Sequence, residues 1–87
     1  MYEVLLSKNA IKKLQKIDSQ IRKMILNWID KNLTNVNDPR IFGKNLSHDK
    51  KDVWRYRIGS YRLLCNIADD KLIILVIEVG RRKEIYK

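Results

Sequence analysis

The sequence contains one cysteine, one proline and three glycines among 87 residues. Cys65 therefore has no partner for an internal disulfide. With His48 as the only histidine, the chain also lacks the set of cysteine and histidine ligands that zinc sites use. We expect no metal and no other cofactor, and we expect Cys65 to pack in the core rather than act as a nucleophile.

Long apolar runs are absent as well. No segment reaches the roughly 20 apolar residues needed to cross a bilayer, so we expect no membrane partner. The first residues, 1–7, lack the basic region, apolar stretch and cleavage site of a secretory signal, which favours a soluble, cytoplasmic protein. The length suits one compact core, and residues 1–87 are expected to form a single domain.

Acidic residues are in short supply. Nineteen lysines and arginines against ten aspartates and glutamates give a formal net charge of +9. This balance favours a polyanionic partner, either nucleic acid or an acidic protein. The alternative is that surface lysines such as Lys12, Lys13 and Lys16 only keep the fold soluble. Charge alone does not decide the function.

The first part of the chain predicts a strand and two helices. Residues 2–6 are short and apolar, as in a strand, and Ser7 is a suitable N-cap for a following helix. Apolar residues at helical spacing then predict one helix on each side of Asp18-Ser19, either of which can cap the second helix, and this helix ends near residue 33. Residues 34–52 predict a loop, and its length makes the stretch 40–52 a candidate for contacting substrate or partner.

From residue 53 the pattern alternates as in strands, predicting strands over 53–58, 61–67 and 72–79. Gly59-Ser60 fits a two-residue hairpin turn, which places Arg57 opposite Arg62. The last run is apolar at every position from 72 to 77, so we expect a central strand covered on both faces. Four mainly antiparallel strands with two N-terminal helices predict a two-layer α+β fold in the order β-α-α-β-β-β.

The hairpin concentrates arginines on one face. Like charges opposite one another repel and cost stability, yet the register places Arg57 beside Arg62, with Arg55 on the same face. Guanidinium groups bind phosphate oxygens in pairs, so this arrangement predicts a phosphate-binding site. The alternative is that these arginines extend into solvent or pair with acidic residues, which would be Asp49, Asp52 or Glu78.

Two segments resemble signature stretches of the RelE/ParE toxin superfamily. They are WRYRIGSYRLL over residues 54–64 and VGRRKEIY over residues 79–86, and Gly43-Lys44 followed by Leu46 is similar to that family's loop motif. The resemblance spans the chain in order. It implies a RelE-like fold and a toxin that cleaves mRNA in the ribosomal A site. It also implies a RelB-like antitoxin as protein partner.

The resemblance also implies roles for individual residues. Arg62 and Arg82 would be catalytic, stabilising the charge that grows on the phosphorane oxygens when the RNA 2′-hydroxyl attacks the adjacent phosphate. Tyr86 would orient the reacting nucleotide and help to move its proton. Four further basic residues would bind RNA, namely Arg55, Arg57, Arg81 and Lys83.

The general base is the point where the chain departs from the family pattern. Many relatives carry histidine or lysine where this chain has Arg81, Arg55 and Arg57, and arginine is a poor proton acceptor. Tyr86 is favoured as the acceptor, and Glu84 is the other candidate general base. His48 is expected to be an exposed loop residue.

Two other functions remain open from the sequence. The same superfamily contains ParE-like toxins that bind DNA gyrase and do not cleave RNA. The basic face would also suffice for a nucleic-acid-binding module without toxic activity.

Overall fold

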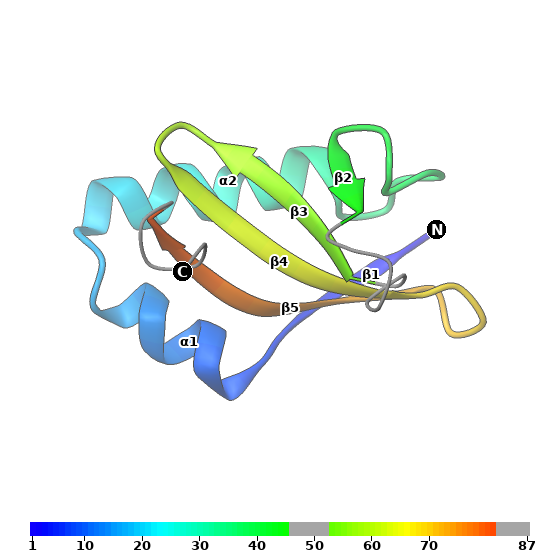
Figure 1. Cartoon of the computed structure of the whole chain (residues 1–87), viewed down its shortest axis with the longest axis horizontal. Helices are drawn as coiled ribbons and strands as arrows, with labels where there is room; N and C mark the ends of the chain where they lie inside the picture. The colour runs from blue at the N-terminus through cyan, green and yellow to red at the C-terminus, as the bar shows by residue number, and fades with distance from the viewer. Residues whose placement is uncertain (46–52, 82–87) are drawn as a thin grey trace.

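The computed structural model describes residues 1–45 and 53–81. In Figure 1 the two helices pack against one twisted sheet. The elements follow the chain as β1 (Glu3–Leu6), α1 (Lys8–Gln15), α2 (Ser19–Asn32), β2 (Gly43–Asn45), β3 (Val53–Ile58), β4 (Tyr61–Ala68) and β5 (Ile73–Arg81). The strand order is β1-β5-β4-β3-β2, with β1 parallel to β5 and the other neighbours antiparallel. The predicted α+β class with two N-terminal helices is confirmed.

Both helices begin at side-chain caps that the sequence predicts. The Ser7 hydroxyl accepts a hydrogen bond from the Ala10 amide at 3.0 Å, and the Asp18 carboxylate accepts one from the Gln20 amide at 3.1 Å. Such caps satisfy amides that the first turn of a helix leaves without intrahelical partners. The side chain of Asn9, in the first turn of α1, also donates to the Ile77 carbonyl of β5 at 3.0 Å. These contacts fix α1 against the sheet.

The hairpin of β3 and β4 has the expected register. Gly59 adopts a φ of +60°, which glycine tolerates without a steric penalty, and Ile58 pairs with Tyr61 across the turn. The same ladder places Arg57 directly opposite Arg62. The sequence-based prediction of the arginine pair is therefore confirmed at the level of the backbone.

Two details of the sheet differ from expectation. The stretch predicted as a loop contains β2, which pairs with β3 and makes the sheet five-stranded rather than four-stranded. β5 is an interior strand as expected, but the described residues do not cover it on both faces. Ile74 and Val76 are fully buried, whereas Ile73 and Leu75 are only partly buried, because the two helices pack on one face of the sheet.

The core lies between that face and the helices. Ala10 and Leu14 of α1 and Ile25 and Ile29 of α2 join buried residues from the sheet in one cluster. The sheet contributes Tyr2 just before β1, Tyr56, Ile58, Tyr61, Leu63, Cys65, Ile67, Ile74, Val76 and Val79. None of the helices in the described part of the chain is long and apolar enough to span a membrane.

Candidate nucleic-acid interface

Basic side chains gather on the sheet face that points away from the helices. Tyr56 and Leu63 are buried in the core, and neighbouring residues in a strand point to opposite faces. Four cationic residues of β2, β3 and β4 therefore share the outer face, where Lys44 pairs with Arg55 and Arg57 pairs with Arg62. We call this set the basic face, and its members are Lys44, Arg55, Arg57 and Arg62.

A pocket of about 230 Å³ opens on the basic face. Phe42, Lys44, Arg55 and Arg57 line it, and the described residues around it include no carboxylate. Three cations and one aromatic ring therefore surround the same small volume. Cations bind phosphate oxygens, and an aromatic side chain can stack on a flat ring. A site of this composition therefore suits a phosphate group attached to a flat, apolar ring system.

Arg62 differs from the other members of the basic face because it is only 4% exposed. Its Nη1 donates to the Tyr61 carbonyl at 3.0 Å and to the Gly59 carbonyl at 3.3 Å, which ties the guanidinium to the hairpin turn. Its cross-strand neighbour on β5 is Gly80. Arg62 is therefore a fixed positive charge beneath the face, whereas Lys44 and Arg57 are exposed on it.

The buried side chain of Tyr56 anchors the turn that leads into β2. This side chain is fully buried, and its hydroxyl donates to the Pro39 carbonyl at 2.5 Å. Burial raises the pKa of the Tyr56 phenol, so the hydroxyl keeps its proton and remains a donor. A Cβ at Gly43 would lie 2.7 Å from the Tyr56 ring, so only glycine lets β2 approach β3 this closely.

A second anchor holds the same turn from the other side. The Arg40 guanidinium donates to both carboxylate oxygens of Asp69, at 2.9 and 3.1 Å, and the Tyr2 hydroxyl donates to the same carboxylate at 2.6 Å. The hydrogen bonds from Arg40 and Tyr2 lower the pKa of Asp69. The guanidinium also lies over the Trp54 ring, 5.5 Å from its centroid. Arg40 thus connects the turn to β3 and to the β4–β5 loop.

Comparison with known proteins identifies the family. The family model described as "ParE toxin of type II toxin-antitoxin system, parDE" matches residues 4–86. The chain belongs to the RelE/ParE toxin superfamily. Comparison with curated protein sequences gives no match.

Solved structures of RelE toxins share the fold. The RelBE2 toxin–antitoxin complex from Mycobacterium tuberculosis contains a chain 26% identical to this toxin, with a TM-score of 0.83, covering 93% of this toxin and 98% of that chain. The isolated RelE toxin of E. coli is 27% identical with a TM-score of 0.74, covering 99% of this toxin and 92% of that chain. The RelB–RelE complex of Methanococcus jannaschii contains a chain that is 26% identical with a TM-score of 0.71, covering 94% of this toxin and 94% of that chain. Several relatives are therefore crystallised with RelB antitoxins.

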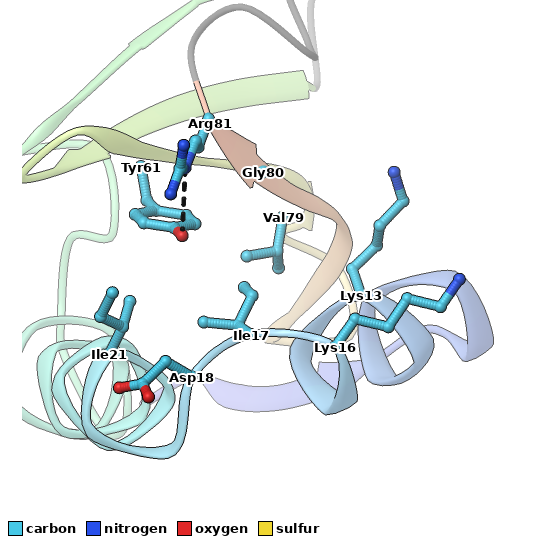
Figure 2. A pocket seen from close by; sticks show the side chains of 9 residues that line it. All are labelled: Lys13, Lys16, Ile17, Asp18, Ile21, Tyr61, Val79, Gly80 and Arg81. Carbon is cyan, nitrogen blue, oxygen red and sulfur yellow. Dashed lines mark hydrogen bonds between the residues drawn. The ribbon is translucent and has the colours of Figure 1, made fainter.

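The structure does not bring Arg81 together with Arg55 and Arg57. The β4–β5 register pairs Arg81 with Tyr61, whose side chain faces the helices, and its Nε donates to the Tyr61 hydroxyl at 3.4 Å (Figure 2). Arg81 also lies over the Tyr61 ring, 5.9 Å from its centroid. It lines a separate pocket of about 480 Å³ that also involves Lys13, Lys16, Ile17, Asp18, Ile21, Val79 and Gly80. Of the predicted RNA-binding arginines, two thus share the basic face and the third lies on the helix side.

Several predicted residues fall outside the part of the toxin that the structure describes. They are Arg82, Lys83, Glu84 and Tyr86 in the C-terminal motif, together with His48, Asp49 and Asp52. Glu78, the remaining acidic residue considered for the arginines, forms an ion pair with Lys13 of α1 at 3.8 Å. Cys65 is fully buried and its pKa is raised to about 12 by burial, which confirms that it packs in the core.

Sequence reasoning missed Phe42 as a member of the site, although it marked the surrounding loop as a candidate. Phe42 is the only phenylalanine in the sequence and is 61% exposed. The signal available was an aromatic residue placed directly before the Gly-Lys motif, outside any predicted strand. Arg40 and Asp69 were missed as well, because their pairing joins positions 29 residues apart in the sequence.

Proposed function

We propose that this toxin is a ribosome-dependent endoribonuclease that cleaves mRNA in the A site. The observation that carries the proposal is the row of cations Lys44, Arg55 and Arg57 on the outer face of the sheet, each of which lies opposite another cation. Such an arrangement costs folding stability and supplies what an RNA backbone requires, namely clustered, rigidly mounted phosphate ligands. The superfamily membership supports RNA cleavage as the use of this face.

In the proposed reaction the 2′-oxygen of the substrate attacks the adjacent phosphorus and the 5′-oxygen leaves. The products are a 2′,3′-cyclic phosphate and a 5′-hydroxyl, so one proton leaves the 2′-hydroxyl and one reaches the departing oxygen. Arg62 and Arg82 stabilise the negative charge of the phosphorane. Tyr86 positions the nucleotide and accepts the proton of the 2′-hydroxyl, with Glu84 as the alternative acceptor. Arg55, Arg57 and Lys83 hold the RNA backbone.

The test is to map RNA 5′ ends in translating ribosomes after the toxin is added. The proposal predicts new ends within A-site codons that carry a 5′-hydroxyl, and it predicts their loss when Arg57→Ala is combined with Arg55→Ala. Lys12→Ala is the matched control, because Lys12 is an exposed cation on α1, away from the basic face. Absence of toxin-dependent ends on ribosomes that are otherwise active would refute the proposal.

The partner we propose is a cognate RelB-like antitoxin in the cytoplasm. The support is that relatives sharing 26% identity are crystallised as RelB–RelE complexes. Co-expression of the neighbouring reading frame with a tagged toxin, followed by purification, tests for a stable complex. Recovery of the toxin alone would argue against this partner.

A second candidate function is inhibition of DNA gyrase. It is favoured by one observation, the match of the ParE family model to residues 4–86. A supercoiling assay with purified gyrase separates the two functions. Loss of supercoiling without any RNA cleavage would establish the second function and remove the first.

A further inference from the structure

Phe42 is an exposed aromatic residue in a position where burial is not required by the fold. Its side chain is 61% exposed, and its neighbour Ile41 is 67% exposed. Neither contributes to the hydrophobic core. Because these two large apolar side chains remain in water, neither contributes the free energy that burial of apolar surface would give to folding. Their exposure indicates a partner that covers at least one of them.

The backbone that carries Phe42 is held on both sides. Pro39 is bound by the Tyr56 hydroxyl, and Arg40 is bound by the Asp69 carboxylate. The Gly43 amide then donates to the Arg40 carbonyl at 3.2 Å, which closes the turn, and Gly43 enters β2 by pairing with Tyr56. The exposed ring is therefore mounted on a braced turn, and binding through it loses little backbone entropy.

The ring and the cations share one pocket. Phe42 lines the pocket of about 230 Å³ together with Lys44, Arg55 and Arg57, whereas Ile41 does not line it. Proteins that bind single-stranded nucleic acids combine these two elements, an aromatic face on which a base stacks and cations that hold the adjacent phosphate. A carboxylate-rich protein segment would match the cations but gives no reason for an exposed aromatic ring beside them.

We propose that Phe42 and the three cations form a subsite for one nucleotide of single-stranded RNA. The base stacks on the Phe42 ring, and the phosphate lies against Lys44, Arg55 and Arg57. The inference rests on the proposed function in taking RNA as the substrate. It goes beyond that function by naming Phe42 as a residue that binds an unpaired base by stacking and takes no part in bond cleavage.

The experiment measures equilibrium binding of a fluorescently labelled, single-stranded oligoribonucleotide by anisotropy at fixed salt. Phe42→Ala is expected to raise Kd by about tenfold or more, because a stacked base contributes an amount of this order. Phe42→Trp is expected to bind as tightly as the original toxin or more tightly. Ile41→Ala is the matched control, with similar exposure in the same turn but no place in the pocket, and is expected to change Kd less than twofold.

A second probe separates stacking from charge. An abasic oligomer with the same ribose-phosphate backbone is expected to bind the original toxin and Phe42→Ala equally, while Lys44→Ala weakens binding of both probes. Equal Kd values for Phe42→Ala and the original toxin on the base-containing probe would overturn the subsite. A loss of binding in Ile41→Ala as large as that in Phe42→Ala would overturn it as well.

The outcome for the subsite is separate from that for RNA cleavage. Base-dependent binding through Phe42 without cleavage on ribosomes would refute the proposed nuclease and support the subsite as an RNA contact. Cleavage on ribosomes with an unchanged Kd for Phe42→Ala would support the nuclease and refute the subsite. Phe42 lies outside the core, so thermal unfolding of Phe42→Ala should match that of the original toxin and confirm that the comparison is between folded proteins.

Discussion

The buried hydrogen bond between Tyr56 and Pro39 should be measurable as stability. Both residues are fully buried, and the hydroxyl donates to the Pro39 carbonyl at 2.5 Å. Tyr56→Phe removes the donor while keeping the ring that packs near Trp28, with centroids 5.7 Å apart. The carbonyl then remains buried without this donor, which costs about 1–3 kcal/mol of unfolding free energy.

The expected loss is large enough for a simple assay. In a protein of this size, 1 kcal/mol corresponds to about 4–8 °C in Tm, so Tyr56→Phe should lower Tm by roughly 4–24 °C. Urea unfolding followed by circular dichroism should show a lower midpoint with an unchanged slope, because the exposed area on unfolding stays the same. If the bond also braces the turn, RNA affinity should fall, by less than Phe42→Ala causes.

Tyr61→Phe is the matched control, since it makes the same chemical change in the same sheet. The Tyr61 side chain is 8% exposed, and its hydroxyl accepts a long hydrogen bond of 3.4 Å from Arg81. Arg81 is exposed, so water replaces the lost acceptor and the cost should be under about 1 kcal/mol. Equal losses in the two variants would refute the reasoning that burial of the Pro39 carbonyl sets the magnitude.

Three further predictions follow from neighbouring contacts. Gly43→Ala should cost about 1–3 kcal/mol, measured by urea unfolding, because its Cβ would lie 2.7 Å from the Tyr56 ring. The hydrogen bonds from Arg40 lower the pKa of Asp69 below its ordinary value of 3.8, so the folded state binds fewer protons than the unfolded state and gains stability as pH rises. The original toxin should therefore be more stable than Asp69→Asn by a constant amount above about pH 5, and this difference in stability should shrink as pH falls below about 3.8. A difference in Tm between the two proteins that does not change with pH would contradict this prediction. Arg57→Gln removes one charge of a like-charged pair, so it should raise stability by about 0.2–1 kcal/mol while weakening RNA binding and reducing the salt dependence of Kd.

Much of this fold is determined by short sequence features such as helix caps and the hairpin turn. Ser7 and Asp18 cap the helices as expected because a cap depends only on residues within one turn. Gly59-Ser60 determines the hairpin register for the same reason, and with it the facing of Arg55, Arg57 and Arg62. Whatever depends on a few adjacent residues was predictable.

The side of the sheet on which Arg81 lies depends on a shift in the β4–β5 register, which the sequence pattern does not predict. Strict alternation from the buried Ile74 and Val76 would place Arg81 on the outer face with the other arginines. The β4–β5 register instead shifts by one residue, since Leu64 pairs with Glu78 but Cys65 pairs with Val76. The extra residue reverses the facing of everything after it, which buries Val79 and turns Arg81 toward the helices.

The extra strand escaped prediction for a different reason. β2 is three residues long and contains no β-branched residue, so its own pattern is that of a loop. It becomes a strand because Gly43 admits the Tyr56 ring and because Tyr56 and Asp69 hold the preceding turn in place. The pocket beside Phe42 depends on that pairing, and these contacts between distant parts of the chain determine the site.

The separation of core and cations on opposite faces of one sheet decides how variants of this toxin should be interpreted. Lys44 and Arg57 are exposed and lie outside the core, so removing their charge should leave the fold intact. Any loss of the proposed RNA-cleaving activity in such a variant would then report on the proposed contact with RNA. Arg62 does not allow that inference, because it is 4% exposed and donates to two backbone carbonyls at the turn. Arg62→Ala would remove a buried donor as well as a cation, so its loss of activity mixes folding with chemistry. Arg62→Lys, compared by both Tm and cleavage rate, separates the two, since a catalytic role predicts a loss of rate that exceeds what the change in Tm accounts for.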